Sequence, residues 1–252
     1  MLRLHRILIL MISLVMTTCK HKESPTLVIA AASNTEFVME ELIQEFTKQT
    51  GITCQLITGS SGKLSSQIKE KAPYDIFISA DMEYPDYLFQ LNLTIDKPLH
   101  FANGKLVIWT LKDSIPPTID FLNNKDVKKI AMPNPKHAPY GIAAMQSLKY
   151  YKKYEGNITK KIVWSESISQ VNHFIYSGAA NIGFTSKSSV LSPKLKNRGV
   201  WTEIDPSSHK PIQQVLIILK NTKNRNAARR FKEFIISDNA KEILNKFGYI
   251  TF

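Results

Sequence analysis

The chain lacks the short motifs that mark the common enzyme classes. Its 252 residues contain no H-E-x-x-H, G-x-S-x-G or C-x-x-C motif, and no S-x-x-K accompanied by its partner motifs. The histidines show neither metal-ligand nor triad spacing, and the sequence has no internal repeat or low-complexity tract. These absences favour a protein that binds a ligand and releases it unchanged.

Cysteine is scarce, and the first of the two cysteines lies at the end of an export signal. Residues 1–18 combine Arg3 and Arg6 with the apolar run Ile7–Met16, which is too short to span a bilayer as a lasting helix. This pattern predicts a signal peptide, and therefore an exported protein in the periplasm or at the cell surface.

The segment Met16-Thr17-Thr18-Cys19 resembles a bacterial lipobox, although Met16 and Thr18 replace its usual residues. We expect Cys19 to be lipidated and to anchor the protein to a membrane, with residues 19–25 as a tether. Ordinary cleavage that removes Cys19 is the alternative. Either way only Cys54 stays in the fold, so an internal disulfide is excluded, and we interpret Cys54 as a small buried hydrophobic residue.

Acidic residues are too few to balance the basic ones. The chain has 33 Lys and Arg against 21 Asp and Glu, for a net charge of +12. The lysines are dispersed and no nucleic-acid-binding motif occurs, so nucleic acid is not an expected partner. We interpret most of the excess as a solvated surface, and any functional part as steering of a small anion.

Apolar strands alternate with amphipathic helices along most of the chain. The predicted strands include Thr53–Thr58, Asp75–Ala80, Lys105–Leu111, Lys129–Met132, Ile162–Trp164, Ile182–Thr185 and Gln213–Leu219. Helices are predicted from a Ser33-x-x-Glu36 capping box to Gly51, and at 64–71, 81–91, 141–154, 167–177, 224–237 and 239–247. This alternation in two sets predicts an α/β fold of two lobes, with the chain crossing between them more than once.

Three segments share one design, in which an apolar strand ends in a small polar loop that opens a helix. They are Leu27–Asn34, Ile52–Gly62 and Lys129–Gly141. A helix start leaves backbone N–H groups unpaired and carries the positive end of the helix dipole. Several such starts meeting at one point make an anion site without any formal charge.

Each of these loops also has a purely structural interpretation. Gly59-Ser60-Ser61-Gly62-Lys63 lacks the spacing of a phosphate-binding P-loop, and it can serve as a turn that starts a helix. Ser33 and Asn34 can likewise act only as helix caps. The tyrosines at 150, 151 and 154 suggest iron ligation, but Tyr151 fits the apolar stripe of its helix and packing is the safer interpretation.

Taken together, the loops resemble the periplasmic molybdate-binding proteins of ABC importers, which are type II periplasmic binding proteins. The resemblance covers about residues 26–252, with the elements in the same order. Its motifs are Ala30–Asn34, Gly59–Gly62, Ala72–Asp81, Asn134–Gly141, Glu166–Gln170, Asn181–Thr185 and a tail at 229–249. It implies two α/β lobes with a ligand cleft between them, residues 26–104 and 212–252 forming the first lobe and 105–211 the second.

The resemblance also implies a set of ligand-binding residues. Ser33 and Ser61 would donate hydrogen bonds to an oxyanion, Tyr140 and Ile168 would contribute from the second lobe, and Asn34 matches a position of the first ligand loop. Ser186 stands where one branch of the family has a tyrosine, which puts its role in doubt.

The implied function is that of an extracytoplasmic binding protein that holds molybdate or tungstate by neutral hydrogen-bond donors and delivers it to an ABC permease. Molybdenum or tungsten would be present only as the bound oxyanion, with no cofactor, no enzymatic activity and a monomeric chain. The alternatives are a binding protein for sulfate, phosphate or ferric iron, and a secreted serine hydrolase using Ser61 with Lys63.

Overall fold

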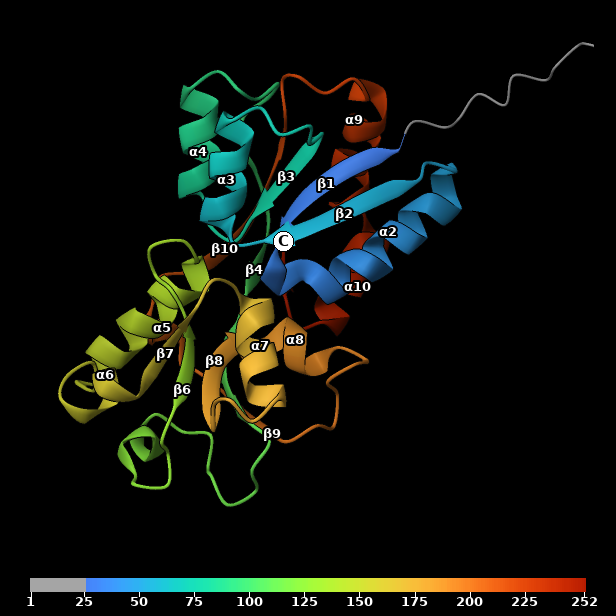
Figure 1. Ribbon diagram of the computed structural model, residues 1–252. Helices are drawn as coiled ribbons and strands as arrows, with labels where there is room; N and C mark the ends of the chain where they lie inside the picture. The colour runs from blue at the N-terminus through green and yellow to red at the C-terminus, as the bar shows by residue number, and fades with distance from the viewer. Residues whose placement is uncertain (1–25) are drawn as a thin grey trace, which may run out of the picture.

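The computed structural model describes residues 26–252, which form two α/β lobes stacked end to end (Figure 1). The predicted signal peptide, the tether and the lipidated Cys19 lie outside the described residues. Within residues 26–252 no helix combines the length and the apolar character needed to cross a membrane.

The first lobe is built on a six-stranded mixed sheet. Its spatial order is β11 (Ile250–Thr251), β4 (Leu99–Gly104), β10 (Ile212–Ile218), β3 (Ile76–Ser79), β1 (Leu27–Ala32) and β2 (Cys54–Gly59). β1 pairs in parallel with both β2 and β3, whereas β10 runs antiparallel to β3 and β4. The C-terminal ends of β1 and β2 therefore lie side by side, because Ala32 is paired with Gly59.

The second lobe contains a five-stranded sheet. Its order is β7 (Ile162–Ser165), β6 (Ile130–Pro133), β8 (Ile182–Ser186), β5 (Leu106–Thr110) and β9 (Val200–Glu203). The chain passes from the first sheet to the second between β4 and β5, and it returns between β9 and β10. The prediction of two α/β lobes with repeated crossings is confirmed, and the residue-by-residue division into lobes stays a prediction.

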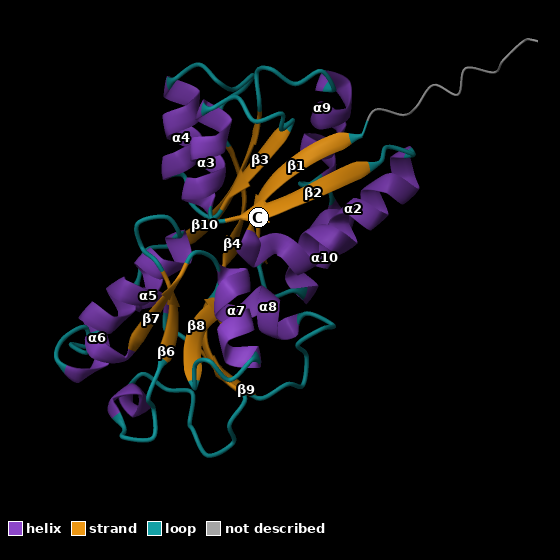
Figure 2. Cartoon of the chain, in the orientation of Figure 1, coloured by secondary structure: helices purple, strands orange, loops and turns teal. Residues whose placement is uncertain are grey.

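Helices cover both faces of each sheet (Figure 2). In the first lobe they are α2 (Glu36–Thr50), α9 (Arg225–Phe234) and α10 (Asp238–Lys246) on one face and α3 (Ser61–Lys69) and α4 (Glu83–Gln90) on the other. In the second they are α5 (Pro139–Tyr150), α6 (Asn157–Lys161), α7 (Ile168–Tyr176) and α8 (Lys187–Leu191). Three short 3₁₀ turns, η1 (Ser33–Thr35), η2 (Asp120–Asn123) and η3 (Pro206–Ser208), complete the described elements.

Successive side chains of a strand point to opposite faces of the sheet, and here both sets are apolar, so both faces are covered by helices. In β1, Leu27, Ile29 and Ala31 pack toward α2 and α9, whereas Ala30 packs toward α3. In β5, Leu106 and Ile108 belong to one core and Val107 and Trp109 to the other. Buried apolar residues on both faces are typical of sheets enclosed between helix layers.

The structure corrects three local predictions. Ser33 and Glu36 do not form a capping box, because η1 separates β1 from α2 and the Glu36 carboxylate accepts a hydrogen bond from Ser169 instead. Cys54 is only half-buried, since it starts an edge strand, although this burial still raises the pKa of its thiol to about 12. Tyr151 lies just after α5 and is exposed rather than inward-facing.

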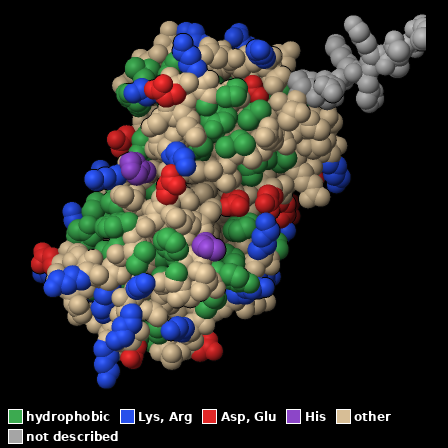
Figure 3. Space-filling model, in the orientation of Figure 1, with side chains coloured by type: hydrophobic (Ala, Val, Ile, Leu, Met, Phe, Trp, Pro, Cys, Tyr) green, Lys and Arg blue, Asp and Glu red, His purple; other side chains and the backbone are tan. Residues whose placement is uncertain are grey.

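Several elements have no counterpart in the predictions. They are β4, β9, β11, α6, α8 and the three 3₁₀ turns. The basic side chains are spread over both lobes on the face drawn in Figure 3, without gathering into one patch. On this face the basic side chains are distributed as on a solvated surface.

Candidate oxyanion site

Loops from both lobes meet at a small cavity between the two sheets. η1 follows β1 and α3 follows β2 in the first lobe, while α5 and α7 begin at the same place from the second. The cavity is lined by Ala32, Ser33, Asn34, Gly59, Ser60, Ser61, Ala80, Ala138, Pro139, Tyr140 and Ile168. All five principal candidates from the sequence, Ser33, Asn34, Ser61, Tyr140 and Ile168, are therefore brought together.

The cavity is small, and most of the residues that line it are buried. Its volume is about 10 Å³ for the centre of a water-sized sphere, which by this measure is about the room that one water molecule needs. Ser33 is 5% exposed, Ser61 is fully buried and Tyr140 is 2% exposed. In this arrangement the cavity has room for about one water molecule, so even a compact ion of a few atoms requires the lobes to move apart.

Two of the lining serines use their oxygen atoms as acceptors. The Ile168 N–H donates to Ser33 Oγ at 3.1 Å across the two lobes, and the Ala80 N–H donates to Ser61 Oγ at 3.1 Å. A hydroxyl that accepts from an N–H still has its own proton to donate. Ser33 and Ser61 are therefore arranged to donate O–H groups to an acceptor in the cavity.

Two further residues that line the cavity, Ser60 and Tyr140, carry hydroxyls without a hydrogen-bond partner in the described protein. Among the described residues, three buried side-chain polar atoms lack a hydrogen bond, and two of them are Ser60 Oγ and Tyr140 Oη. Burial raises the pKa of Tyr140 well above 10, so its phenol stays protonated and available as a donor. Unpaired buried hydroxyls are costly, and because both belong to residues that line one cavity, a ligand is the acceptor that we expect there.

The cavity wall carries no charged side chain, as its lining shows. Its positive potential comes from the starts of α3, α5 and α7, which direct backbone dipoles toward it. Neutral donors held by the fold can replace the hydration shell of an anion. A cation would find neither a carboxylate nor a thiolate here.

Close backbone approach explains the glycine at the end of β4. A Cβ atom on Gly104 would collide with Tyr140 Oη and come within 3.2 Å of Gln214 Nε2. Glycine therefore lets the phenol of the second lobe lie against the strand through which the chain leaves the first. Gly62 has a similar role, because a Cβ atom there would lie 2.6 Å from Tyr84 Oη and 3.0 Å from the His137 carbonyl, which accepts from the Gly62 N–H across the lobes.

The side chain of Asn34 is held by the first lobe. Its amide nitrogen donates to Gln214 Oε1 at 2.8 Å and to Tyr249 Oη at 3.2 Å, and the Tyr249 hydroxyl donates to the Asn34 carbonyl at 2.9 Å. Both amide protons are thus committed inside the protein. Asn34 lines the cavity chiefly as a residue that fixes the first loop.

Sequence comparison identifies the family to which this architecture corresponds. Residues 27–250 match the family described as bacterial extracellular solute-binding protein. The chain belongs to this family of solute-binding proteins.

Related members give the identification more detail. The solute-binding protein is 30% identical to a molybdate-binding protein ModA of Rhodobacter capsulatus over 95% of this chain and 94% of that protein. It is 26% identical to a molybdate-binding protein ModA of Escherichia coli over 90% and 89% of the two chains. The solved periplasmic molybdate-binding protein of Azotobacter vinelandii superimposes with a TM-score of 0.85 at 30% identity, covering 90% of this chain and 99% of that one.

Ser186 lies away from the cavity of the solute-binding protein. Its hydroxyl caps α8, where it accepts from the Ser189 N–H at 3.2 Å and lies 2.8 Å from Ser189 Oγ. The structure does not bring it together with the other candidates.

The Ser61 and Lys63 pair is not arranged for nucleophilic catalysis. Lys63 Nζ lies 2.9 Å from Glu166 Oε1 in a half-exposed ion pair, while Ser61 Oγ accepts from Ala80. Lys63 Nζ is thus engaged with Glu166 and is not hydrogen-bonded to the serine hydroxyl.

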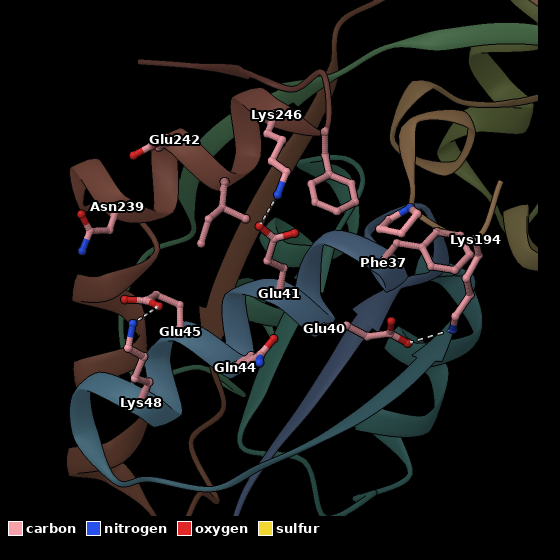
Figure 4. A pocket seen from close by; sticks show the side chains of 13 residues that line it. Phe37, Glu40, Glu41, Gln44, Glu45, Lys48, Lys194, Asn239, Glu242 and Lys246 are labelled. Atoms are coloured by element: carbon pink, nitrogen blue, oxygen red, sulfur yellow. Dashed lines mark hydrogen bonds and ion pairs between the residues drawn. The ribbon is translucent and has the colours of Figure 1, made fainter. Parts of the chain in front are cut away.

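A much larger groove lies between α2 and α10 of the first lobe, and Pro193 and Lys194, which follow α8 of the second lobe, also line it (Figure 4). Its volume is about 720 Å³, and each of its three lysines pairs with a glutamate of α2: Lys48 with Glu45, Lys194 with Glu40 and Lys246 with Glu41. Since each of these lysines has a glutamate partner, the groove lacks the unpaired buried hydroxyls that distinguish the small cavity.

Sequence reasoning missed Ser60. This residue precedes α3 as its N-cap, yet its hydroxyl makes no capping hydrogen bond and is one of the two unpaired groups in the cavity wall. The only signal in the sequence was a second serine in the loop that already contained Ser61.

Proposed function

We propose that this solute-binding protein binds a tetrahedral oxyanion, molybdate or tungstate, in the cavity between its lobes and delivers it to an ABC permease. The observation that supports the proposal is the set of four cavity hydroxyls, on Ser33, Ser60, Ser61 and Tyr140, that have protons to donate and no acceptor in the described protein. Relatives named as molybdate-binding proteins support the choice of ligand.

The energetics fit a doubly charged guest. A hydrogen bond to a charged group contributes about 1.5–3 kcal/mol, so four such hydroxyl donors supply about 6–12 kcal/mol, a range that includes the roughly 8 kcal/mol of micromolar binding. The oxyanion is only an acceptor and the cavity hydroxyls are donors, so charge and hydrogen-bonding capacity are complementary. Size then has to separate molybdate and tungstate from sulfate, because all three are tetrahedral dianions.

Ferric iron is the weaker candidate on physical grounds. Iron in proteins favours carboxylate, imidazole or phenolate ligands, whereas the cavity wall has no carboxylate and the raised pKa of Tyr140 opposes its ionisation. Binding without chemical change is the role that this neutral donor set supports, and we expect no enzymatic activity.

Isothermal titration with molybdate, tungstate, sulfate, phosphate and ferric citrate tests the proposal. We expect tight one-to-one binding of molybdate and tungstate and much weaker binding of the other three. Absence of heat with every oxyanion, or tighter binding of iron, would reject it.

The membrane attachment is a separate part of the proposal. We expect the mature chain to begin at a lipidated Cys19 and to act as a monomer at the membrane. Intact-mass measurement of the exported protein would show a diacylglyceryl addition, and Cys19→Ser would release the chain. Cleavage after Cys19 would show instead that the protein is free after export.

A further inference from the structure

Two ion pairs of the described residues join the lobes: Lys194 with Glu40 at the outer groove, and Lys63 with Glu166 beside the cavity. Lys63, the third residue of α3 in the first lobe, pairs with Glu166, which lies between β7 and α7 in the second, with Nζ and Oε1 2.9 Å apart. The two side chains are 51% and 55% exposed. The pair therefore lies at the solvent-facing rim, whereas the cavity beneath it is buried.

Each partner is tied to a ligand loop by sequence. Lys63 follows Ser61 by two residues at the start of α3, and Glu166 precedes Ile168 by two residues before the start of α7. Below the ion pair, the Ile168 N–H bonds Ser33 across the same boundary. The rim contact and the cavity contacts thus form and break with the same movement of the lobes.

Closure is required because the cavity residues are almost inaccessible to solvent. Ligand entry and release need an open state in which Lys63 and Glu166 are apart. A contact present only in the closed state stabilises that state, and it slows release rather than entry. The pair also neutralises Glu166, whose free carboxylate would repel an anion held at the start of α7.

We propose that Lys63 and Glu166 are positioning residues that form a closure latch, an interlobe ion pair that retains the bound anion by opposing lobe separation. The inference rests on the proposed oxyanion function, and it assigns a role to the lysine that stood out beside Ser61 in the sequence. The latch acts through the lobe geometry and does not touch the ligand.

A charge-swap experiment tests the latch. The variants are Lys63→Glu, Glu166→Lys and the double swap, with Lys246→Glu, Glu41→Lys and their double swap as matched controls. The control pair has the same 2.8–2.9 Å separation but joins α10 and α2 inside one lobe. Release of molybdate is followed by rapid-mixing tryptophan fluorescence, and unfolding of the ligand-free protein by urea.

Each single reversal at 63 or 166 should speed molybdate release by about 3- to 10-fold, which is the scale expected from losing an exposed pair and adding a repulsion. The entry rate should change less, and the double swap should return release to within about twofold of the wild type. The control reversals should leave release unchanged. Unaltered release in the single variants, or a double swap that fails to rescue, would overturn the latch.

Small-angle X-ray scattering of the ligand-free chain separates this inference from the proposed function. The single reversals should increase the radius of gyration, and the double swap should restore it. If the wild type binds no oxyanion but the scattering follows this pattern, the ligand assignment is wrong and the latch stands. Identical scattering from all variants contradicts the latch whatever the ligand is.

Discussion

The interlobe cavity is far smaller than the groove between α2 and α10, yet the cavity is the better candidate for the binding site. The groove is the larger, at about 720 Å³ against about 10 Å³, and it holds the charged side chains. Its lysines, however, already have glutamate partners, whereas the cavity holds uncharged hydroxyls that have protons and no acceptor. In this protein, buried hydroxyls without an acceptor indicate the ligand site better than the volume of a pocket or its formal charge.

We expect the largest effect on ligand binding from removal of the Ser61 hydroxyl. Ser61→Ala deletes a donor to the anion and also leaves the buried Ala80 N–H without its acceptor. We expect molybdate affinity to fall by about 10- to 100-fold and the free energy of unfolding to fall by about 1–3 kcal/mol. Calorimetric titration and urea unfolding measure the two effects, and unchanged affinity would remove Ser61 from the site.

Substitutions of Ser60 and Tyr140 should separate an effect on ligand affinity from an effect on the stability of the fold. Ser60→Ala and Tyr140→Phe each delete a hydroxyl that has no protein partner. Affinity should fall by about 10-fold or more in each variant, while the free energy of unfolding stays the same or rises, since removing an unsatisfied buried group is neutral or stabilising. A loss of stability without a loss of affinity would show that these hydroxyls serve the fold.

Asp81 is an ionisable residue that lines a second cavity between the lobes, next to the candidate site; Ala80 and Pro139 line this cavity too. Burial raises the pKa of Asp81 from its ordinary value of 3.8 to about 6, and hydrogen bonds from the Tyr84 N–H and the Ser79 hydroxyl offset this only in part. The folded state then binds the proton more tightly than the unfolded state, so this group's contribution to stability falls as pH rises from about 4 to above 6.

The variant Asp81→Asn should therefore gain stability relative to the wild type as pH increases over that range. Urea unfolding of both proteins at pH 4 and pH 7.5 measures the difference. A difference that does not change with pH would mean that the carboxyl group titrates normally.

The smallest effect is expected in the groove. Lys246→Met and Glu41→Gln break an exposed ion pair, so each should change the free energy of unfolding by less than about 1 kcal/mol and leave oxyanion affinity unchanged. A clear loss of affinity in either variant would mean that the groove, not the cavity, senses the ligand.

Local pattern was sufficient to predict the parts of the site that one segment builds by itself. The strand, small polar loop and helix around Ser33, Ser61 and Tyr140 follow from hydrophobic periodicity and turn residues. The Ser33 and Ser61 loops meet because the parallel neighbours β1 and β2 end side by side, whereas the Tyr140 loop reaches them from the other lobe. The two-lobe fold was predictable for the same reason.

Partners that are distant in sequence were not predictable from it. Glu36 resembled a capping residue, but it bonds Ser169 of the other lobe, and Lys63 finds its partner at Glu166. Strand β4 has the polar sequence Leu-His-Phe-Ala-Asn-Gly and exists because it pairs with β10 and β11. In each case the deciding contact lies more than a hundred residues away, where no local pattern reaches.

The most direct test of neutral oxyanion recognition is anomalous diffraction from crystals grown with tungstate. The account predicts one strong tungsten peak between the lobes, with ligand oxygens within hydrogen-bond distance of the hydroxyls of Ser33, Ser60, Ser61 and Tyr140. A peak in the groove between α2 and α10, or one held by lysine side chains, would contradict it.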